Sequence, residues 1–141
     1  MSKPHVVAVE GSWINGDPAA SLDLNSRAFN FGDGLFETLL VLDGRPMLLD
    51  LHWQRLVLGC SKLQLALDEK ALRGELNQVL SCLPAGLVRL KVIVSRIVGT
   101  APGYGSTDDA CDRIIQVFPA SSPVNNTWQN GISLSVAEHR L

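Results

Sequence analysis

The stretch from Ser26 to Leu63, SRAFNFGDGLFETLLVLDGRPMLLDLHWQRLVLGCSKL, decides the fold because it contains a strand, a hairpin loop and a helix in succession. Leu35 to Leu42 is rich in β-compatible residues, and Asp43-Gly44 suits a two-residue hairpin loop that requires positive φ angles. Arg45 to Leu49 would then return antiparallel. Asp50 is the expected cap of a helix whose apolar residues recur at three- and four-residue steps: Trp53, Leu56, Val57, Cys60 and Leu63.

The rest of the chain predicts one more helix and more strands. Glu69 to Leu83 has an apolar face, with Asp68 as its cap and Pro84 as its end. Further strands are expected at Val6–Trp13, Leu87–Ser95, Arg113–Phe118 and Ile132–Val136, with a Gly- and Pro-rich loop from Gly99 to Ser106. The predicted fold is α+β, with an open, mostly antiparallel sheet of about six strands and two amphipathic helices in one domain, residues 1–141.

Composition narrows the function classes. Hydrophobic residues make up 46% and charged residues 18% of the chain, so we expect part of its surface to pack against a partner. A net charge of -2 does not favour nucleic-acid binding, and no apolar run approaches the ~20 residues of a membrane helix. The three cysteines share no CxxC spacing, which argues against disulfides and a metal site and favours the cytoplasm.

The same stretch carries a family resemblance. Its pattern is an arginine, Phe-Gly-Asp-Gly-x-Phe, a strand with threonine, an Asp-Gly turn and His-x-Gln-Arg-Leu, found here from Arg27 to Leu56. This pattern resembles the N-terminal domain of fold-type IV pyridoxal-phosphate enzymes, the class IV aminotransferase superfamily, and among them most the 4-amino-4-deoxychorismate lyases. The resemblance implies pyridoxal 5'-phosphate as cofactor.

Arg55 is the first candidate site residue. The resemblance implies that Arg55 binds the cofactor phosphate, and a guanidinium offers two parallel donors to phosphate oxygens. From periodicity alone, Arg55 could also lie on the polar side of a surface helix. His52 is compatible with capping, packing or titration, or with support of the neighbouring arginine.

Phe31, Phe36 and Thr38 lie where the resemblance implies the substrate side of the pocket. Phe36 and Thr38 are two apart on one expected strand, so they should face the same way. Core packing is the alternative for both phenylalanines. Leu40 stands where branched-chain aminotransferases of the superfamily carry an arginine. We also expect an exposed apolar area beside Arg55, because the low charge content suggests a covered face.

Three further features remain open. Gly32-Asp33-Gly34 is also a common turn, in which Asp33 could order the strand that follows. Pro102 stands where many relatives carry an arginine resembling a substrate-carboxylate ligand. Arg89 or Lys91 could replace that arginine, although cations on an edge strand more often face solvent.

The resemblance places the catalytic Schiff-base lysine beyond Leu141, so the chain is expected to be the N-terminal part of a longer enzyme and inactive alone. The complete enzyme would convert 4-amino-4-deoxychorismate to 4-aminobenzoate and pyruvate for folate synthesis, as a cytoplasmic homodimer whose C-terminal domain completes the site. The alternatives are a D-amino acid or branched-chain aminotransferase, or a non-catalytic domain if the chain is complete.

Overall fold

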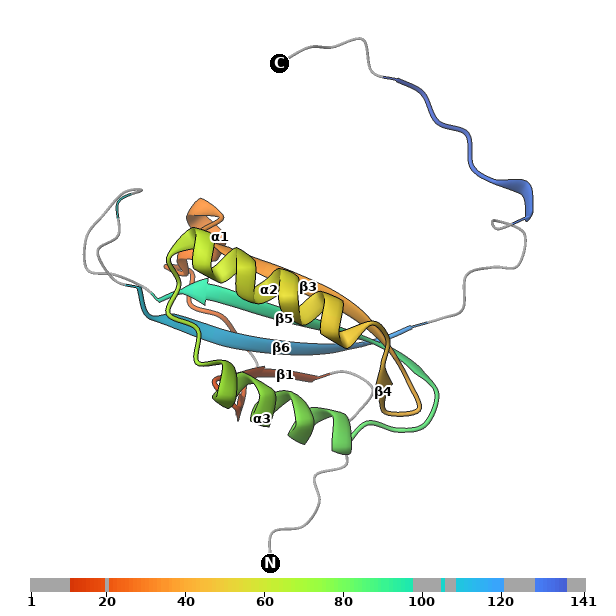
Figure 1. Cartoon of the computed structure of the whole chain (residues 1–141), viewed down its shortest axis with the longest axis horizontal. Coiled ribbons are helices and arrows are strands. Elements are labelled where there is room, and N and C mark those ends of the chain that lie inside the picture. The colour runs from red at the N-terminus through yellow and green to blue at the C-terminus, as the bar shows by residue number, and fades with distance from the viewer. Residues whose placement is uncertain (1–10, 20, 98–104, 106–108, 121–128, 137–141) are drawn as a thin grey trace, which may run out of the picture.

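The computed structural model describes residues 11–19, 21–97, 105, 109–120 and 129–136. They form one six-stranded sheet in the order β2-β1-β6-β5-β3-β4, in which every pair of neighbours is antiparallel. The strands are β1 Gly11–Ile14, β2 Asp17–Pro18, β3 Gly34–Leu42, β4 Arg45–Pro46, β5 Leu87–Arg96 and β6 Cys111–Pro119. The helices are α1 Arg27–Phe31, α2 Leu49–Leu63 and α3 Glu69–Ser81, of which α2 and α3 lie on one side of the sheet (Figure 1). The predicted α+β class is therefore confirmed.

The core lies between the sheet and the two long helices. Along β3, residues alternate between buried and exposed from Phe36 onward, because successive side chains of a strand point to opposite faces. The buried apolar side chains come from both layers: Leu39, Val41, Trp53, Leu56, Cys60, Leu65, Leu72, Leu76, Val79, Val88, Leu90, Val92, Val94, Ile115 and Val117. The strand face that carries Phe36, Thr38 and Leu40 lies opposite this core and is exposed.

The hairpin loop between β3 and β4 forms as the sequence predicts. Asp43 and Gly44 both have positive φ angles, of 49° and 73°, and connect Leu42 to its partner Arg45. The returning strand is shorter than expected, because β4 ends at Pro46 and the chain turns at Leu48, whose φ is 55°.

The helix starts are partly as predicted. Asp68 caps α3, since its side chain accepts a hydrogen bond from the backbone N–H of Ala71 at 2.9 Å. The prediction that Asp50 caps α2 is wrong. Leu48 occupies the cap position, and Asp50 lies in the first turn, where a carboxylate still interacts favourably with the helix dipole.

Two expectations outside the core need correction. Ile132–Val136 is not a strand: it pairs with no strand in the described part of the chain, and Ile132 and Val136 are 71% and 95% exposed. A β-compatible sequence needs a neighbouring strand to complete its hydrogen bonds. The short helix α1 was not expected. Residues 6–10 and Pro102 lie outside the described residues.

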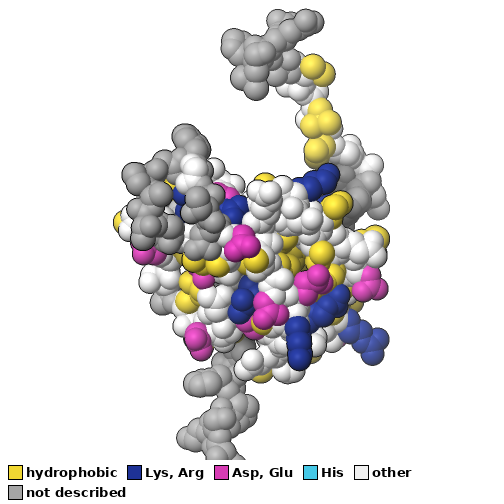
Figure 2. Space-filling view, turned by 60° about the vertical axis from the view of Figure 1, so that its left-hand side comes forward, with side chains coloured by type: hydrophobic (Ala, Val, Ile, Leu, Met, Phe, Trp, Pro, Cys, Tyr) yellow, Lys and Arg dark blue, Asp and Glu magenta, His cyan; other side chains and the backbone are white. Residues whose placement is uncertain are grey.

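Three findings concern function classes directly. Cys60, Cys82 and Cys111 are free thiols, and the residues that the structure describes contain no metal-binding group of His, Cys, Asp and Glu. Among those same residues, no helix has the length and apolar character needed to cross a membrane. The face drawn in Figure 2 has acidic and basic side chains interspersed around apolar ones.

Candidate functional site

Glu37 is the centre of a polar cluster between β3 and α2. Its position on the strand directs the side chain toward the helices, where it is 4% exposed. Arg55 donates through Nε to Oε1 at 2.6 Å and through Nη2 to Oε2 at 2.5 Å. His52 lies one turn before Arg55 on α2, and its Nδ1 is 2.7 Å from Oε2. One buried carboxylate therefore holds two side chains of the same helix.

The charges of this cluster follow from its hydrogen bonds. The Arg55 guanidinium lowers the pKa of Glu37, against the opposing effect of burial, and the His52 hydrogen bond lowers it further. Glu37 in turn raises the pKa of Arg55. Glu37 is thus ionised at neutral pH and can only accept. Nδ1 of His52 must therefore carry the proton in this contact.

Arg55 has capacity left for a further anion. A guanidinium has five N–H donors, and Glu37 takes one from Nε and one from Nη2. The end formed by Nη1 and Nη2 has no further partner among the described residues, and the Arg55 side chain is 71% exposed. A phosphate can accept two parallel hydrogen bonds there, so the residues fit the phosphate of the implied cofactor.

The approach to Arg55 must come from outside the core. A small hollow between the sheet and the helices is lined by Glu37, Leu39, Leu49, His52, Trp53, Leu56, Leu76 and Val92, and its volume of about 10 Å³ is at the lower limit for a single water molecule. A cofactor cannot enter this space. The solvent-facing end of Arg55 is the part that a ligand can reach.

Phe36 and Thr38 share one face of β3, as predicted, and Leu40 lies on it too; this face is opposite to the one that carries Glu37. Phe36 is 59% exposed, and the ammonium of Lys91 lies 4.3 Å from the centre of its ring, a cation–π contact. Lys91, on the adjacent strand β5, lies directly opposite Thr38 in the strand pairing. An aromatic ring, a hydroxyl and an ammonium thus meet on one open surface, while Arg55 binds Glu37 on the helix side of the same strand.

The interpretation of Arg89 and Lys91 as edge-strand residues is wrong. Their strand β5 lies between β3 and β6 and is paired along its whole length. Leu40 and Phe118 lie on either side of Arg89 in the register, 44% and 37% exposed. The open face therefore has large apolar side chains at its surface. It lies on the opposite side of β3 from Glu37 and its contact with Arg55, whereas the apolar area was expected beside Arg55.

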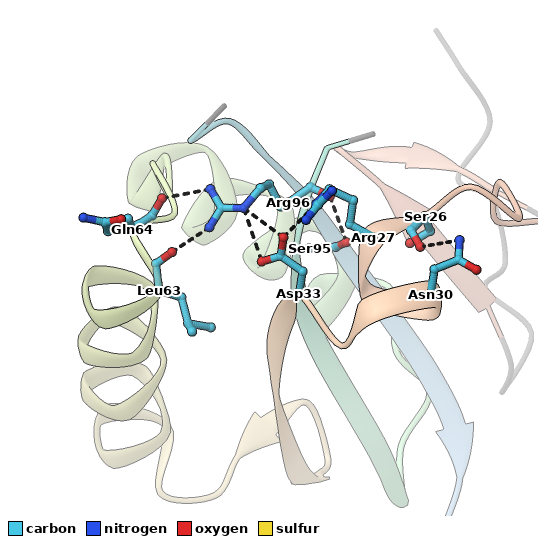
Figure 3. Close-up of polar contacts among 8 residues, drawn as sticks. All are labelled: Ser26, Arg27, Asn30, Asp33, Leu63, Gln64, Ser95 and Arg96. Atoms are coloured by element: carbon cyan, nitrogen blue, oxygen red, sulfur yellow. Dashed lines mark hydrogen bonds and ion pairs between the residues drawn. The ribbon is translucent and has the colours of Figure 1, made fainter. Parts of the chain in front are cut away.

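Phe31 ends α1 and is 37% exposed, with the Arg27 guanidinium 5.0 Å from its ring centre. Arg27 is itself 3% exposed and donates through Nε to Oδ2 of Asp33 at 2.7 Å. Arg96, at the end of β5, donates to both oxygens of the same carboxylate at 3.2 and 3.1 Å. We call these three residues, Arg27, Asp33 and Arg96, the buried clasp (Figure 3).

The buried clasp also fixes the end of α2. Arg96 donates through Nη1 and Nη2 to the backbone carbonyls of Gln64 and Leu63, at 3.1 and 2.6 Å. Carbonyls at a helix C-terminus have no partner within the helix, so a buried guanidinium stabilises them. Burial raises the pKa of Asp33, but the hydrogen bonds from the two arginines outweigh it, and the net pKa is lowered.

The glycines on both sides of Asp33 explain the Gly-Asp-Gly sequence. Gly32 ends α1 with a φ of 65°, a conformation that glycine adopts without steric cost. A Cβ on Gly34 would lie 2.6 Å from the backbone oxygen of Val94, so β3 and β5 can approach only without a side chain there. This backbone places Asp33 between Arg27 and Arg96, which are 69 residues apart in the sequence.

Sequence reasoning missed one residue of these two clusters and left the role of another open. Glu37 was missed, although a signal existed: it is a charged residue among apolar ones at an inward position of a strand whose alternation was already recognised. The role of Asp33 was considered only in general terms. Its arginine partners could not be found from the sequence, because neither spacing corresponds to a local motif.

With this geometry in view, the chain was compared with known proteins. The family Amino-transferase class IV matches residues 34–140. The chain belongs to the class IV aminotransferase family. Solved structures that resemble this chain include fold-type IV pyridoxal-phosphate enzymes, which confirms the resemblance.

Two of the proteins to which the chain is similar are lyases. It is 29% identical to an aminodeoxychorismate lyase of Vibrio harveyi over 92% of its own length and 47% of that protein. The crystal structure of 4-amino-4-deoxychorismate lyase from Pseudomonas aeruginosa matches with a TM-score of 0.75 and 39% identity, over 86% of this chain and 44% of that one. The chain thus spans about half the length of these relatives.

A third relative carries the cofactor. A hypothetical aminotransferase from Mycobacterium tuberculosis, in its PLP-bound form, matches with a TM-score of 0.70 and 26% identity, over 88% of this chain and 44% of that one. The family and its similar structures are pyridoxal-phosphate enzymes, lyases or aminotransferases. The Arg55 geometry is compatible with that chemistry.

Proposed function

We propose that the chain is the N-terminal domain of a pyridoxal 5'-phosphate-dependent 4-amino-4-deoxychorismate lyase, which releases pyruvate and leaves 4-aminobenzoate. The observation that carries the proposal is its 39% identity to the Pseudomonas aeruginosa lyase over 86% of the chain. Branched-chain aminotransferases of Escherichia coli match at 19% and 20%, a similarity of fold alone. Leu40 supports the distinction, because those enzymes would place an arginine there.

The residues take separate roles in the proposal. Arg55 binds the cofactor phosphate with the end of its guanidinium that Glu37 leaves open. Phe31, Phe36 and Thr38 form the substrate side, where the Phe36 ring can stack on the cyclohexadiene ring of the substrate. The cofactor, when bound, withdraws electrons from the substrate carbon attached to the amino group.

The rest of the enzyme is part of the same proposal. A C-terminal domain would supply the lysine and complete the site, and the matched relatives are about twice as long as this chain. Lys62 and Lys91 do not fit that role: Lys62 lies in the last turn of α2, and Lys91 stacks on Phe36 at the open face. We further propose a homodimer, a cytoplasmic location and a role in folate synthesis.

The test is a product assay with the full-length protein. Purified enzyme with pyridoxal 5'-phosphate is given 4-amino-4-deoxychorismate, and pyruvate and 4-aminobenzoate are quantified separately. We expect both products in equal amounts, and no turnover from residues 1–141 alone. Transfer of an amino group from a D- or branched-chain amino acid to a 2-oxo acid, without aromatisation, would instead assign the protein to the aminotransferases.

A further inference from the structure

Glu37 occupies a position where a stable core would favour an apolar residue. On the same side of β3, Leu39 and Val41 are 2% and 0% exposed. A carboxylate buried beside them needs hydrogen bonds to offset the loss of water, and an apolar replacement of similar volume is often at least as stable. Packing alone therefore does not explain a glutamate at this position, and we expect a role in its hydrogen bonds.

The partner of Glu37 indicates what that role is. Arg55 is mostly exposed, and an exposed arginine normally moves among several rotamers, whose loss opposes ligand binding. The two hydrogen bonds from Nε and Nη2 to Glu37 hold the guanidinium plane in one orientation. In this orientation the end formed by Nη1 and Nη2 is left for a ligand.

His52 fixes the carboxylate in turn. Its Nδ1 bonds Oε2 of Glu37, so three hydrogen bonds from one turn of α2 determine where the carboxylate lies. Residues three apart on a helix lie on the same side, so His52 and Arg55 both reach the strand below. The cluster is rigid at its buried end and open at its exposed end.

We infer that Glu37, held by His52, is a positioning residue that presents the open end of Arg55 to the phosphate of the cofactor. The inference rests on the proposed function, in which Arg55 binds that phosphate. Orientation and charge oppose each other here, since a negative carboxylate near a phosphate is repulsive. Removal of the Glu37 charge therefore weakens binding if orientation dominates and strengthens it if charge dominates.

The experiment measures binding rather than turnover. Dissociation constants of pyridoxal 5'-phosphate and of pyridoxal, which lacks the phosphate, are determined for the cofactor-free full-length protein and for Glu37→Gln. The matched control is Glu75→Gln. Glu75 on α3 also accepts hydrogen bonds from Nε and Nη2 of one arginine, Arg113, although here both nitrogens bind the same oxygen, Oε1, at 3.1 and 2.7 Å.

We expect Glu37→Gln to weaken pyridoxal 5'-phosphate binding about tenfold, with pyridoxal affinity within about twofold of wild type. Glu75→Gln should change neither constant. In the double variant with Arg55→Ala, Glu37→Gln should add no further loss, because a positioning residue acts through the residue it positions. If Glu37→Gln does not fold, Glu37→Asp keeps the charge with a shorter reach and should show the same loss.

Unchanged or tighter pyridoxal 5'-phosphate binding by Glu37→Gln would overturn the inference, as would an equal loss of pyridoxal. If Arg55→Ala leaves the ratio of the two constants unchanged, the phosphate role of Arg55 fails and the inference with it. If the ratio shifts as expected but no pyruvate is released in the product assay, the lyase reaction fails while the positioning role of Glu37 stands.

Discussion

The buried clasp and the Glu37 cluster both pair a carboxylate with arginine, but the two arrangements differ in how much of the arginine is exposed. In the clasp, two arginines share the carboxylate of Asp33. In the cluster, one arginine makes two hydrogen bonds to the carboxylate of Glu37. In the clasp, Arg27 and Arg96 are 3% and 9% exposed, and Arg96 also bonds two backbone carbonyls. In the cluster, the Arg55 side chain is 71% exposed and one end of it is open. A buried arginine whose donors all bond protein groups stabilises the fold, while an exposed arginine that bonds the protein on one side only can still bind a ligand.

The strongest way to break this comparison is Asp33→Asn. The substitution leaves two buried guanidinium groups without their shared counter-charge, and breaking a buried ion pair costs about 3–5 kcal/mol. Urea unfolding of the protein should show this loss. Asp17→Asn, at an exposed position in β2, is the control and should change stability by less than about 0.5 kcal/mol. Equal effects would mean that the clasp does not hold the fold.

Arg55→Ala tests the opposite side of the comparison. In the full-length protein, loss of a two-donor contact should weaken pyridoxal 5'-phosphate binding about 30- to 150-fold, because each charge-assisted hydrogen bond contributes to affinity. The rate of the bound enzyme should change less than the affinity. Titration of the cofactor into cofactor-free protein measures this, and an unchanged constant would make Arg55 a surface residue like any other.

His52→Phe sharpens the comparison within the cluster. The substitution keeps a ring on α2 but removes one hydrogen bond to the buried carboxylate, which should cost about 1.5 kcal/mol of stability. Unfolding in urea at neutral pH measures it. His52→Gln, whose amide can still donate to Oε2, should recover part of the loss. No recovery would indicate that ring packing, rather than the hydrogen bond, is the role of His52.

The smallest and most gradual effect is expected on acidification. Asp33 and Glu37 have pKa values below their ordinary 3.8 and 4.5, so the folded protein binds these protons more weakly than the unfolded chain. The resulting stability is complete above those ordinary values and is lost as pH falls through the lowered ones. Unfolding free energies measured from about pH 6 to pH 3 should decline more steeply for wild type than for Glu37→Gln. Parallel declines would contradict the assignment for Glu37.

The sequence by itself determined the local elements and the family. The Asp43-Gly44 loop, the Asp68 cap and the apolar faces of α2 and α3 follow from backbone preferences and spacing, which act over a few residues. The opposite placement of Glu37 and Phe36 follows from strand alternation, and the Gly-Asp-Gly segment and the His-x-Gln-Arg-Leu helix were sufficient for the resemblance. Arg55 and the Phe36–Thr38 face were therefore named in advance, and their roles remain predictions.

The tertiary structure decided how distant residues are paired. Pairing across the sheet places β5 between β3 and β6, which brings Arg96 to Asp33 and Lys91 to Phe36. Among the residues that the structure describes, it also leaves Ile132–Val136 without a strand partner, although the sequence of this segment is compatible with one. Such contacts depend on strand order and helix docking, which no local pattern encodes. For the same reason, only the structure separated an enclosed arginine from one that can still bind an anion.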